Sequence, residues 1–426
     1  MASLKFNTDI DCAKQLDLKD PLSSFRRSFH LPKSGRRPLI YMCGHSLGLM
    51  PRAARRRIDA ELERWASRAV EGHFDKDGGW LNYQQRFRAP LAALLGARAD
   101  EVVAMNTLTV NLHLMMVTFF RPDKQRHKIL IERGAFPSDR YAVQSQLRFH
   151  GLRPEHSLLE FGPQSGSGLL DPEEFAEFLE SEGERIALVL LPGVQYLSGQ
   201  LLDLSRYVEI AHRYGCRIGF DLAHAIGNVP LALHDSGADF AVWCSYKYLN
   251  SGPGAVAGCF IHRRHADRPD LPRFAGWWGH EESSRFDMPQ NFSPMPGAAA
   301  WQLSNPPIFS LAPLSASLEL FERASIARLR RKSEQLTGYL YFLLQHSLGT
   351  RIKILTPAIT QQRGCQISVQ LSAGTANSQY VAQHIREAGV LVDWRPPDVL
   401  RLAPVPLYSR FRDVFAVVKA LQQALK

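Results

Sequence analysis

The middle of the chain alternates between short apolar stretches and longer amphipathic ones. The short stretches are apolar on both faces, which predicts strands of a mostly parallel sheet covered by helices on both sides. We expect strands at residues 101–106, 127–132, 185–192, 216–224 and 240–245, and helices at 109–120, 138–149 and 203–214. The stretch 255–263 follows too closely for a helical crossover, so it is predicted to run antiparallel.

The pattern changes from about Ile308. One long helix is predicted over 314–347, followed by short segments at 364–372, 389–395 and 399–406 and by helices near 378–388 and at 409–425. These elements indicate a smaller α+β unit. We therefore expect an N-terminal segment (1–60) that packs beside the small domain, a large α/β domain (61–307) and a small C-terminal domain (308–426).

Composition and charge narrow the class of protein. The chain has 426 residues, of which 45% are hydrophobic and 22% charged, as in ordinary globular enzymes. Its net charge of +10 invites a nucleic-acid hypothesis, but the basic residues come as scattered pairs and triplets without a binding motif. Solvated helix faces explain that charge more simply, and we expect no nucleic-acid partner.

The same survey predicts a cytoplasmic protein with no membrane partner. No uninterrupted apolar run reaches the roughly 18–20 residues that a membrane span requires. The first twenty residues lack the apolar core of a secretory signal and contain acidic residues that transit peptides avoid. The six cysteines show no paired spacing and no CxxC, which favours a reducing compartment.

One lysine interrupts the apolar stretch "FAVWCSYKYLNSGPGAVAGCFI" at 240–261. Lys247 stands between Tyr246 and Tyr248, and a lysine is rarely buried without a partner. Its stem could pack against apolar neighbours while its amine reaches water. Alternatively, its amine could be held in a dry site and kept reactive for Schiff-base chemistry.

Two further features fall at predicted strand ends, where the ligand crevice of an open α/β sheet lies. Asp221 ends the strand "RIGFD", and Thr109 lies where "MNTLTVN" turns from strand to helix, a potential anion seat. Each could also be a simple helix cap. With Lys247, however, they supply a Schiff-base lysine, an acid for a ring nitrogen and a phosphate seat. That set predicts pyridoxal 5′-phosphate, with Phe136 as an aromatic plate over the ring.

The chain resembles the kynureninases, a family of fold type I pyridoxal-phosphate-dependent hydrolases, and is most similar to the eukaryotic-type members. The motifs that carry the resemblance span about residues 40–410 and are "MNTLTVNLHLMM", "RGAFPSDRYAV", "GFDLAHAIGNVPLALHDSGADFAVWCSYKYLNSGPG", "GWWGHEESSRFDM", "QLSNPPI", "RGCQISV" and "RLAPVPLY". The resemblance implies hydrolytic Cβ–Cγ cleavage of L-kynurenine or 3-hydroxy-L-kynurenine, giving L-alanine and anthranilate or its 3-hydroxy form. The implied fold is fold type I, with a mostly parallel seven-stranded sheet between helices and a smaller α+β C-terminal domain. The implied setting is tryptophan catabolism or NAD biosynthesis, and the implied assembly is a homodimer with shared active sites.

The resemblance also implies roles for individual residues. Lys247 would form the Schiff base, Asp221 would pair with the pyridine nitrogen, and Tyr246 would reach the phosphate and donate a proton. The other implied cofactor-binding residues are Leu108, Thr109, Phe136, Pro137, Ser138, Asp139 and His224, with Trp277 and Asn305 supplied by the second subunit. Arg401 would bind the substrate α-carboxylate, a task suited to its planar fork.

The implied substrate site includes Ser46, His73 and Asn305 besides Arg401. His73 and Asn305 match the eukaryotic-type members, which favours 3-hydroxykynurenine modestly. Two positions depart from the family pattern. His45 in "GHSLG" replaces an asparagine near the substrate entrance, and Pro192 replaces a serine of the phosphate seat. Proline offers neither an N–H nor a hydroxyl, so one phosphate contact is expected to be missing.

Three alternatives remain open at the level of sequence. A cysteine desulfurase or another lyase of the same fold could use Cys365 as a persulfide carrier, although the favoured interpretation of Cys365 is a small residue that opens a strand. A catalytically silent interaction protein could retain the same fold. Metal catalysis has little support, because the 15 histidines form no HExxH or comparable motif.

Overall fold

A computed structural model describes residues 6–163, 168–266, 268, 270–372 and 378–426. Residues 1–5, with which the predicted N-terminal segment begins, lie outside the described residues. Within the described parts of the chain, none of the helices is both long and apolar enough to cross a membrane.

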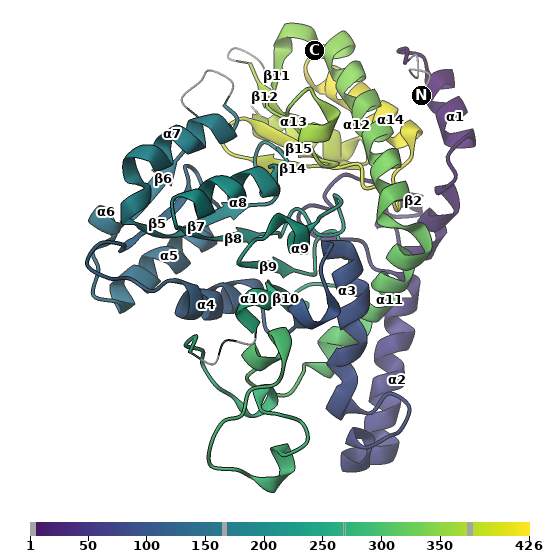
Figure 1. The fold of residues 1–426 in the computed structure, drawn as a ribbon. Coiled ribbons are helices and arrows are strands. Elements are labelled where there is room, and N and C mark those ends of the chain that lie inside the picture. The colour runs from purple at the N-terminus through teal and green to yellow at the C-terminus, as the bar shows by residue number, and fades with distance from the viewer. Residues whose placement is uncertain (1–5, 164–167, 267, 269, 373–377) are drawn as a thin grey trace.

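A seven-stranded sheet forms the centre of the molecule (Figure 1). Its strands, in spatial order, are β4 (Val102–Ala104), β10 (Ala257–Ile261), β9 (Phe240–Cys244), β8 (Arg217–Asp221), β7 (Ile186–Pro192), β5 (Lys128–Glu132) and β6 (Leu158–Phe161). β10 alone runs opposite to the other six strands of this sheet, as predicted. The edge strand β6 was not predicted, because it is short and directly follows a helical turn.

Alternate strand residues pack into two separate cores, which explains why the strands are apolar on both faces. Ile129 and Ile131 pack with α4 (Leu108–Phe119) and α5 (Pro137–Phe149) on one face. Leu130 faces the other core, which is built on the helices α3 (Arg88–Leu95), α7 (Pro172–Glu182), α8 (Leu204–Arg213) and α11 (Ile308–Ala324). The predicted α/β fold with helices on both faces of the sheet is confirmed.

A second sheet is built from the C-terminal part of the chain. It is antiparallel, in the order β11 (Ile352–Ile354), β12 (Ile367–Leu371), β15 (Val399–Leu402) and β14 (Asp393–Arg395). Its core includes side chains from α12 (Ile326–Leu348), α13 (Ser378–Glu387) and α14 (Phe411–Ala424).

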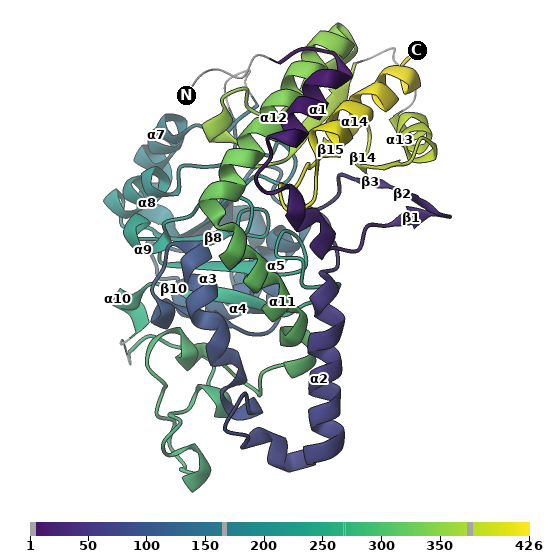
Figure 2. The same ribbon diagram turned by 90° about the vertical axis from the view of Figure 1, so that its right-hand side faces the viewer.

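Residues near the two ends of the chain lie side by side (Figure 2). Helix α1 (Ile10–Leu18) packs against α14, and β3 (Ile40–Tyr41) pairs in parallel with β13 (Val390–Leu391). The limits of the three predicted domains remain predictions.

The single long helix predicted at 314–347 is wrong. The structure has two helices, α11 and α12, separated by Ser325, whose φ of 58° lies in the left-handed region. The Ser325 side chain accepts a hydrogen bond from the N–H of Arg328 and so caps α12. Because of this break, α11 belongs to the core of the large sheet and α12 to the core of the small one.

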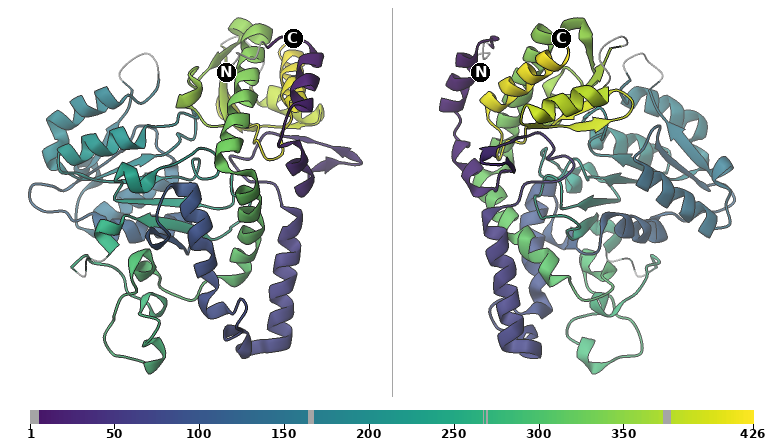
Figure 3. Two further views of the ribbon diagram at one scale, coloured as in Figure 1. Left: turned by 45° about the vertical axis from the view of Figure 1, so that its right-hand side comes forward. Right: turned by 180° about the vertical axis from the view of Figure 1, so that it is seen from behind.

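Two parts of the chain project from the same end of the molecule (Figure 3). One is α2 (Arg52–Arg68), which packs along α11, and the other is the segment 270–296. The remaining short elements are β1 (Lys33–Ser34), β2 (Arg37–Pro38), α6 (Pro154–Ser157), α9 (Leu233–Ser236) and α10 (Arg263–Ala266).

Candidate active site

A pocket opens at the edge of the large sheet where its parallel strands end. The residues that follow β4, β5, β7, β8 and β9 converge there, as expected for an open α/β sheet. Its lining consists of Leu108, Thr109, Glu132, Phe136, Ser138, Asp139, Pro192, Val194, Tyr196, Asp221, Ala223, His224, Tyr246 and Lys247. The structure thus brings together most of the cofactor-binding residues that the sequence suggested.

Lys247 reaches this pocket from the turn after β9. Its Nζ lies 5.8 Å from the ring centroid of Phe136 and 5.9 Å from that of Tyr246, within range of cation–π attraction. The turn is held from behind by Gly48, whose N–H donates to the carbonyl of Tyr246. A Cβ at Gly48 would collide with the backbone carbonyl of Lys247, so this close approach requires glycine.

His224 is the direct partner of Lys247. Its Nε2 lies 3.1 Å from Lys247 Nζ. Burial and the nearby ammonium lower the pKa of His224 well below its ordinary value. The imidazole is therefore neutral at physiological pH, with one ring nitrogen available to accept a hydrogen bond from Lys247.

Three carboxyl groups gather on the opposite side of the pocket. Burial raises the pKa of Asp221, and Lys247 and the N–H of Ala223, which donates to Asp221 at 2.6 Å, act against that rise. Burial and the adjacent Asp221 raise the pKa of Asp139 well above its ordinary value. Burial raises the pKa of Glu132 to about 8. Such a group of acids holds protons unless a cation joins it.

Two helices begin at the other end of the pocket. Leu108 and Thr109 form the first turn of α4, and Pro137 and Ser138 form the first turn of α5. The hydroxyls of Thr109 and Ser138 lie 2.9 Å apart. Free N–H groups and the helix dipoles make this a seat for an anion.

These residues fit pyridoxal phosphate. The paired helix starts suit its phosphate, and Lys247 suits its aldehyde. The Oδ1 atom of Asp139 is buried and has no hydrogen-bond partner among the described residues, beside Asp221. A protonated ring nitrogen would satisfy this group of acids.

A second polar cluster lies beside the pocket, centred on Asp393. It accepts from the Nε atoms of both Arg401 and Arg395 at 2.9 Å and from the hydroxyl of Ser46 at 2.7 Å. Arg401 is 1% exposed, and its Nη1 donates to the carbonyl of Tyr196 at 2.8 Å. The sequence analysis proposed Ser46 and Arg401 but missed Asp393. In the sequence, Asp393 is a single acidic residue in a short strand, and nothing in the pattern around it indicates its contact with Arg401.

Six of the proposed residues do not line the Lys247 pocket of this chain. Ser46 and Arg401 belong to the adjacent Asp393 cluster and Pro137 starts α5, whereas His73, Trp277 and Asn305 lie elsewhere. His73 packs edge-on against Trp80, with ring centroids 5.1 Å apart. Trp277 is 42% exposed on the projecting segment, and Asn305 is exposed nearby in the sequence. Sequence reasoning also missed Glu132 and Tyr196, which the pocket includes. Glu132 could have been noticed as an acid that ends an apolar strand.

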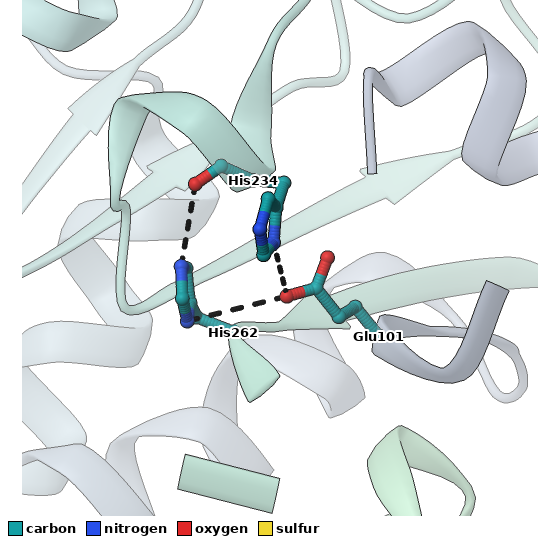
Figure 4. Close-up of side chains that lie close together, drawn as sticks. All are labelled: Glu101, His234 and His262. Atoms are coloured by element: carbon teal, nitrogen blue, oxygen red, sulfur yellow. Dashed lines mark hydrogen bonds and ion pairs between the residues drawn. The ribbon is translucent and has the colours of Figure 1, made fainter. Parts of the chain in front are cut away.

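A separate group of possible metal ligands, Glu101, His234 and His262, has a structural explanation (Figure 4). The two imidazoles are stacked, with planes only 13° apart, so their in-plane lone pairs do not converge on one point. Glu101 accepts hydrogen bonds from His234 Nδ1 and from the N–H groups of Arg98 and Arg263. These hydrogen bonds connect Glu101, just before β4, with Arg263, just after β10, and therefore stabilise the fold.

Comparison with known proteins settles the family. The chain is 54% identical over 410 residues to a kynureninase of Xanthomonas euvesicatoria pv. vesicatoria, covering 96% of this chain and 97% of that one. It is also 54% identical over 406 residues to a kynureninase of Xanthomonas oryzae pv. oryzae, covering 95% and 96%. This chain belongs to the kynureninase family. The family model for the kynureninase C-terminal domain matches residues 329–421.

Solved structures with low sequence identity share the fold. A cysteine desulfurase from Thermococcus onnurineus superposes with a TM-score of 0.75 at 16% identity, covering 100% of this chain and 99% of that one. A mutant of the enzyme C-DES with glycine covalently linked to its pyridoxal phosphate cofactor has a TM-score of 0.75 at 18% identity, covering 93% and 98%. The predicted fold type I architecture is confirmed.

Proposed function

We propose that this protein is a kynureninase, which uses pyridoxal phosphate to hydrolyse the Cβ–Cγ bond of L-kynurenine to anthranilate and L-alanine. The observation that carries the proposal is Lys247, held between His224 and the aromatic wall of the pocket and facing Asp221 and Asp139. The chain's similarity to kynureninases over nearly its whole length supports the choice of substrate. The proposed setting is tryptophan catabolism or NAD biosynthesis in the cytoplasm.

The cofactor would be held by the first turns of α4 and α5, by Phe136 and by the Asp221–Asp139 pair. When bound, it supplies an electron sink for bonds at the substrate Cα and Cβ. Lys247 takes the Cα proton, and the neutral imidazole of His224 orients its Nζ by accepting a hydrogen bond. Asp221 and Asp139 hold a proton at the ring end of the site.

Tyr246 is placed to return a proton. Burial, with the neighbouring Cys244, raises the pKa of its hydroxyl, so the phenol stays protonated at physiological pH. We assign it the protonation of the β-carbon after anthranilate has left, which completes L-alanine. Water supplies the oxygen of the anthranilate carboxyl group.

Arg401 provides the positive charge for the substrate carboxylate. Arg395 and Arg401 together carry two positive charges against the one negative charge of Asp393, so the cluster keeps a net charge of +1. The Nη2 contact with Ser46 is long, at 3.3 Å, and is available for exchange with a ligand. This charge complements one carboxylate group.

Trp277 and Asn305 are exposed and do not line the Lys247 pocket of their own chain, which supports a homodimer in which they serve the partner's pocket. We propose that Trp277 and Asn305 complete the site of the partner subunit, and that His73 and Asn305 approach the aromatic ring of the substrate. Mixing Lys247→Ala chains with Trp277→Ala chains tests the assembly. If the two residues come from different subunits, each mixed dimer regains one intact site, and an equimolar mixture regains about a quarter of wild-type activity. If both come from one chain, nothing is regained.

The direct test of function is steady-state turnover by the purified protein supplied with pyridoxal phosphate. We expect L-kynurenine to yield anthranilate and L-alanine in equal amounts, and 3-hydroxy-L-kynurenine to be the better substrate by kcat/KM. No release of either aromatic product would overturn the proposal. A visible cofactor band without turnover would indicate another lyase, and no band at all would indicate a silent protein.

The desulfurase alternative requires a reactive thiol, and Cys365 does not supply one. Cys365 is fully buried and does not line the Lys247 pocket. Burial raises the pKa of its thiol to about 12, so the nucleophilic thiolate is scarce. The structural likeness to cysteine desulfurases therefore concerns the fold and gives Cys365 no catalytic role.

A further inference from the structure

The imidazole of His45 is buried and makes no hydrogen bond with the described residues. It is 1% exposed, and neither Nδ1 nor Nε2 has a hydrogen-bond partner among the described residues. Leaving a buried polar atom unpaired costs about 1–3 kcal/mol. Two such atoms on one side chain call for an explanation.

Two neighbours of His45, Asp393 and His224, explain its unpaired ring nitrogens. Its Nε2 lies 3.8 Å from Oδ2 of Asp393, slightly beyond hydrogen-bond distance. The ring centroid of His224 is 6.3 Å from that of His45, with the two planes 35° apart. The Nδ1 atom of His224 is also buried and has no partner in the described structure. One water joins two ring nitrogens that lie about 5 Å apart, a spacing that ring centroids 6.3 Å apart allow.

The proton positions then follow in order. With the proton of this neutral imidazole on Nε2, the ring would face Lys247 Nζ as a donor, so Lys247 can donate to Nε2 only when that proton is on Nδ1. That Nδ1–H needs an acceptor, and Nδ1 of His45 is one if the His45 proton is on Nε2, facing Asp393. Burial, with Arg401 acting on His45 and Lys247 on His224, lowers the pKa of both imidazoles well below the ordinary value, so each has one donor and one acceptor.

We propose that His45 is a positioning residue that links His224 to Asp393 and thereby fixes the tautomer in which His224 accepts a hydrogen bond from Lys247. This inference rests on the proposed function, because it explains how the catalytic lysine is oriented. It also connects the carboxylate-binding cluster around Asp393 with the base. All three unpaired ring nitrogens gain partners in this arrangement.

The test is nitrogen NMR of the histidine rings in the full-length, cofactor-free protein, which reports directly which nitrogen of His224 bears the proton. His45→Asn retains a polar group near the position of Nδ1, whereas His45→Gln places it near Nε2 and loses the contact toward His224. We expect the proton on Nδ1 of His224 in the wild type and in His45→Asn, and on Nε2 in His45→Gln. A wild-type His224 protonated on Nε2, or an unchanged His224 in His45→Gln, would overturn the proposal.

Kinetics of the cofactor-loaded enzyme give an independent readout. His45→Gln is expected to lower kcat for L-kynurenine about tenfold with KM unchanged within twofold, because the proposal gives His45 a role toward His224 and none in binding the substrate. His45→Asn should restore kcat, and His150→Phe, at the far end of α5, is the control. Equal losses in the Asn and Gln variants would contradict a role in orientation. If neither the wild type nor any variant cleaves kynurenine, the proposed function is wrong. The NMR measurement still shows whether His45 fixes the tautomer of His224.

Discussion

Asp393 holds Arg401 through two contacts of 2.9 Å, from Nε to Oδ1 and from Nη2 to Oδ2. Burial alone would raise the pKa of Asp393, but the hydrogen bonds and charge of Arg401 outweigh it and hold the pKa far below its usual range. The carboxylate is therefore ionised, and it fixes the plane of the guanidinium that we expect to bind the substrate carboxylate.

Removing this support is expected to weaken substrate binding. Asp393→Asn should raise KM for L-kynurenine about tenfold and change kcat less, because Arg401 loses its orientation while Lys247 is retained. The comparison is Arg395→Gln, which removes a neighbour of Asp393 but leaves its contacts with Arg401 intact. Opposite effects would argue that only net charge matters: Asp393→Asn raises the charge of the cluster to +2 and would then lower KM, whereas Arg395→Gln lowers the charge to zero and would raise it.

The hydroxyl of Tyr246 is expected to matter for the chemical step. Tyr246→Phe removes one oxygen and keeps the ring beside Lys247, so folding should survive, and assays at saturating pyridoxal phosphate offset the phosphate contact that the hydroxyl is expected to make. We expect kcat to fall about 100-fold, the usual scale for a lost proton donor. Rapid-quench and steady-state assays with L-kynurenine measure it. A kcat within twofold of the wild type would assign the proton to another group.

Cys365 is expected to be dispensable for the reaction. Cys365→Ala should leave kcat/KM for L-kynurenine within about twofold and lower stability by about 1 kcal/mol through the small cavity it creates. Assays with L-kynurenine and with L-cysteine separate the two possible functions. Release of sulfide that depends on Cys365 would favour the desulfurase alternative.

A charge buried far from the pocket supports the fold. Asp239 is fully buried and contacts His265 at 2.7 Å, Arg264 at 2.8 Å and His212 at 3.0 Å. Replacing it with asparagine leaves these partners without their counter-charge. We expect Asp239→Asn to lower the free energy of unfolding by about 3–5 kcal/mol. Denaturant titration measures this, with the exposed Asp270→Asn as a control that should change nothing.

The same residue predicts a pH dependence of stability. Burial would raise the pKa of Asp239, but hydrogen bonds from His212, His265 and Arg264 outweigh it and hold the pKa far below the usual range. Its contribution is therefore complete above the unfolded value of about 4 and is lost as the pH falls below it. Between about pH 5 and pH 3, around that unfolded value, wild-type stability should fall more steeply than that of Asp239→Asn. Parallel curves would contradict this account.

Much of the fold could be predicted because hydrophobic periodicity is local. The strands from β7 to β9 are apolar on both faces and were predicted nearly to their limits. The break at Ser325 was missed because the apolar pattern continues from α11 into α12, and only the cap at Ser325 marks the boundary.

The site was predicted where its residues end strands or begin helices. Lys247, Asp221 and Thr109 stood out because charge or a hydroxyl interrupts an apolar pattern. Asp393 and Glu132 could not be recognised in the same way, since their meaning depends on contacts with distant residues such as Arg401 and Gln195. His45 was noticed only as a departure from a family motif, and its isolation from hydrogen-bond partners is visible only in three dimensions.

The most direct measurement of the central claim is borohydride reduction of the cofactor-loaded protein followed by peptide mapping. Reduction fixes the cofactor to the amine that holds it. The account predicts a single tagged peptide that contains Lys247, and Lys247→Ala should show neither the tag nor turnover of L-kynurenine. A tag on another lysine, or a Lys247→Ala variant with near-normal turnover, would contradict it.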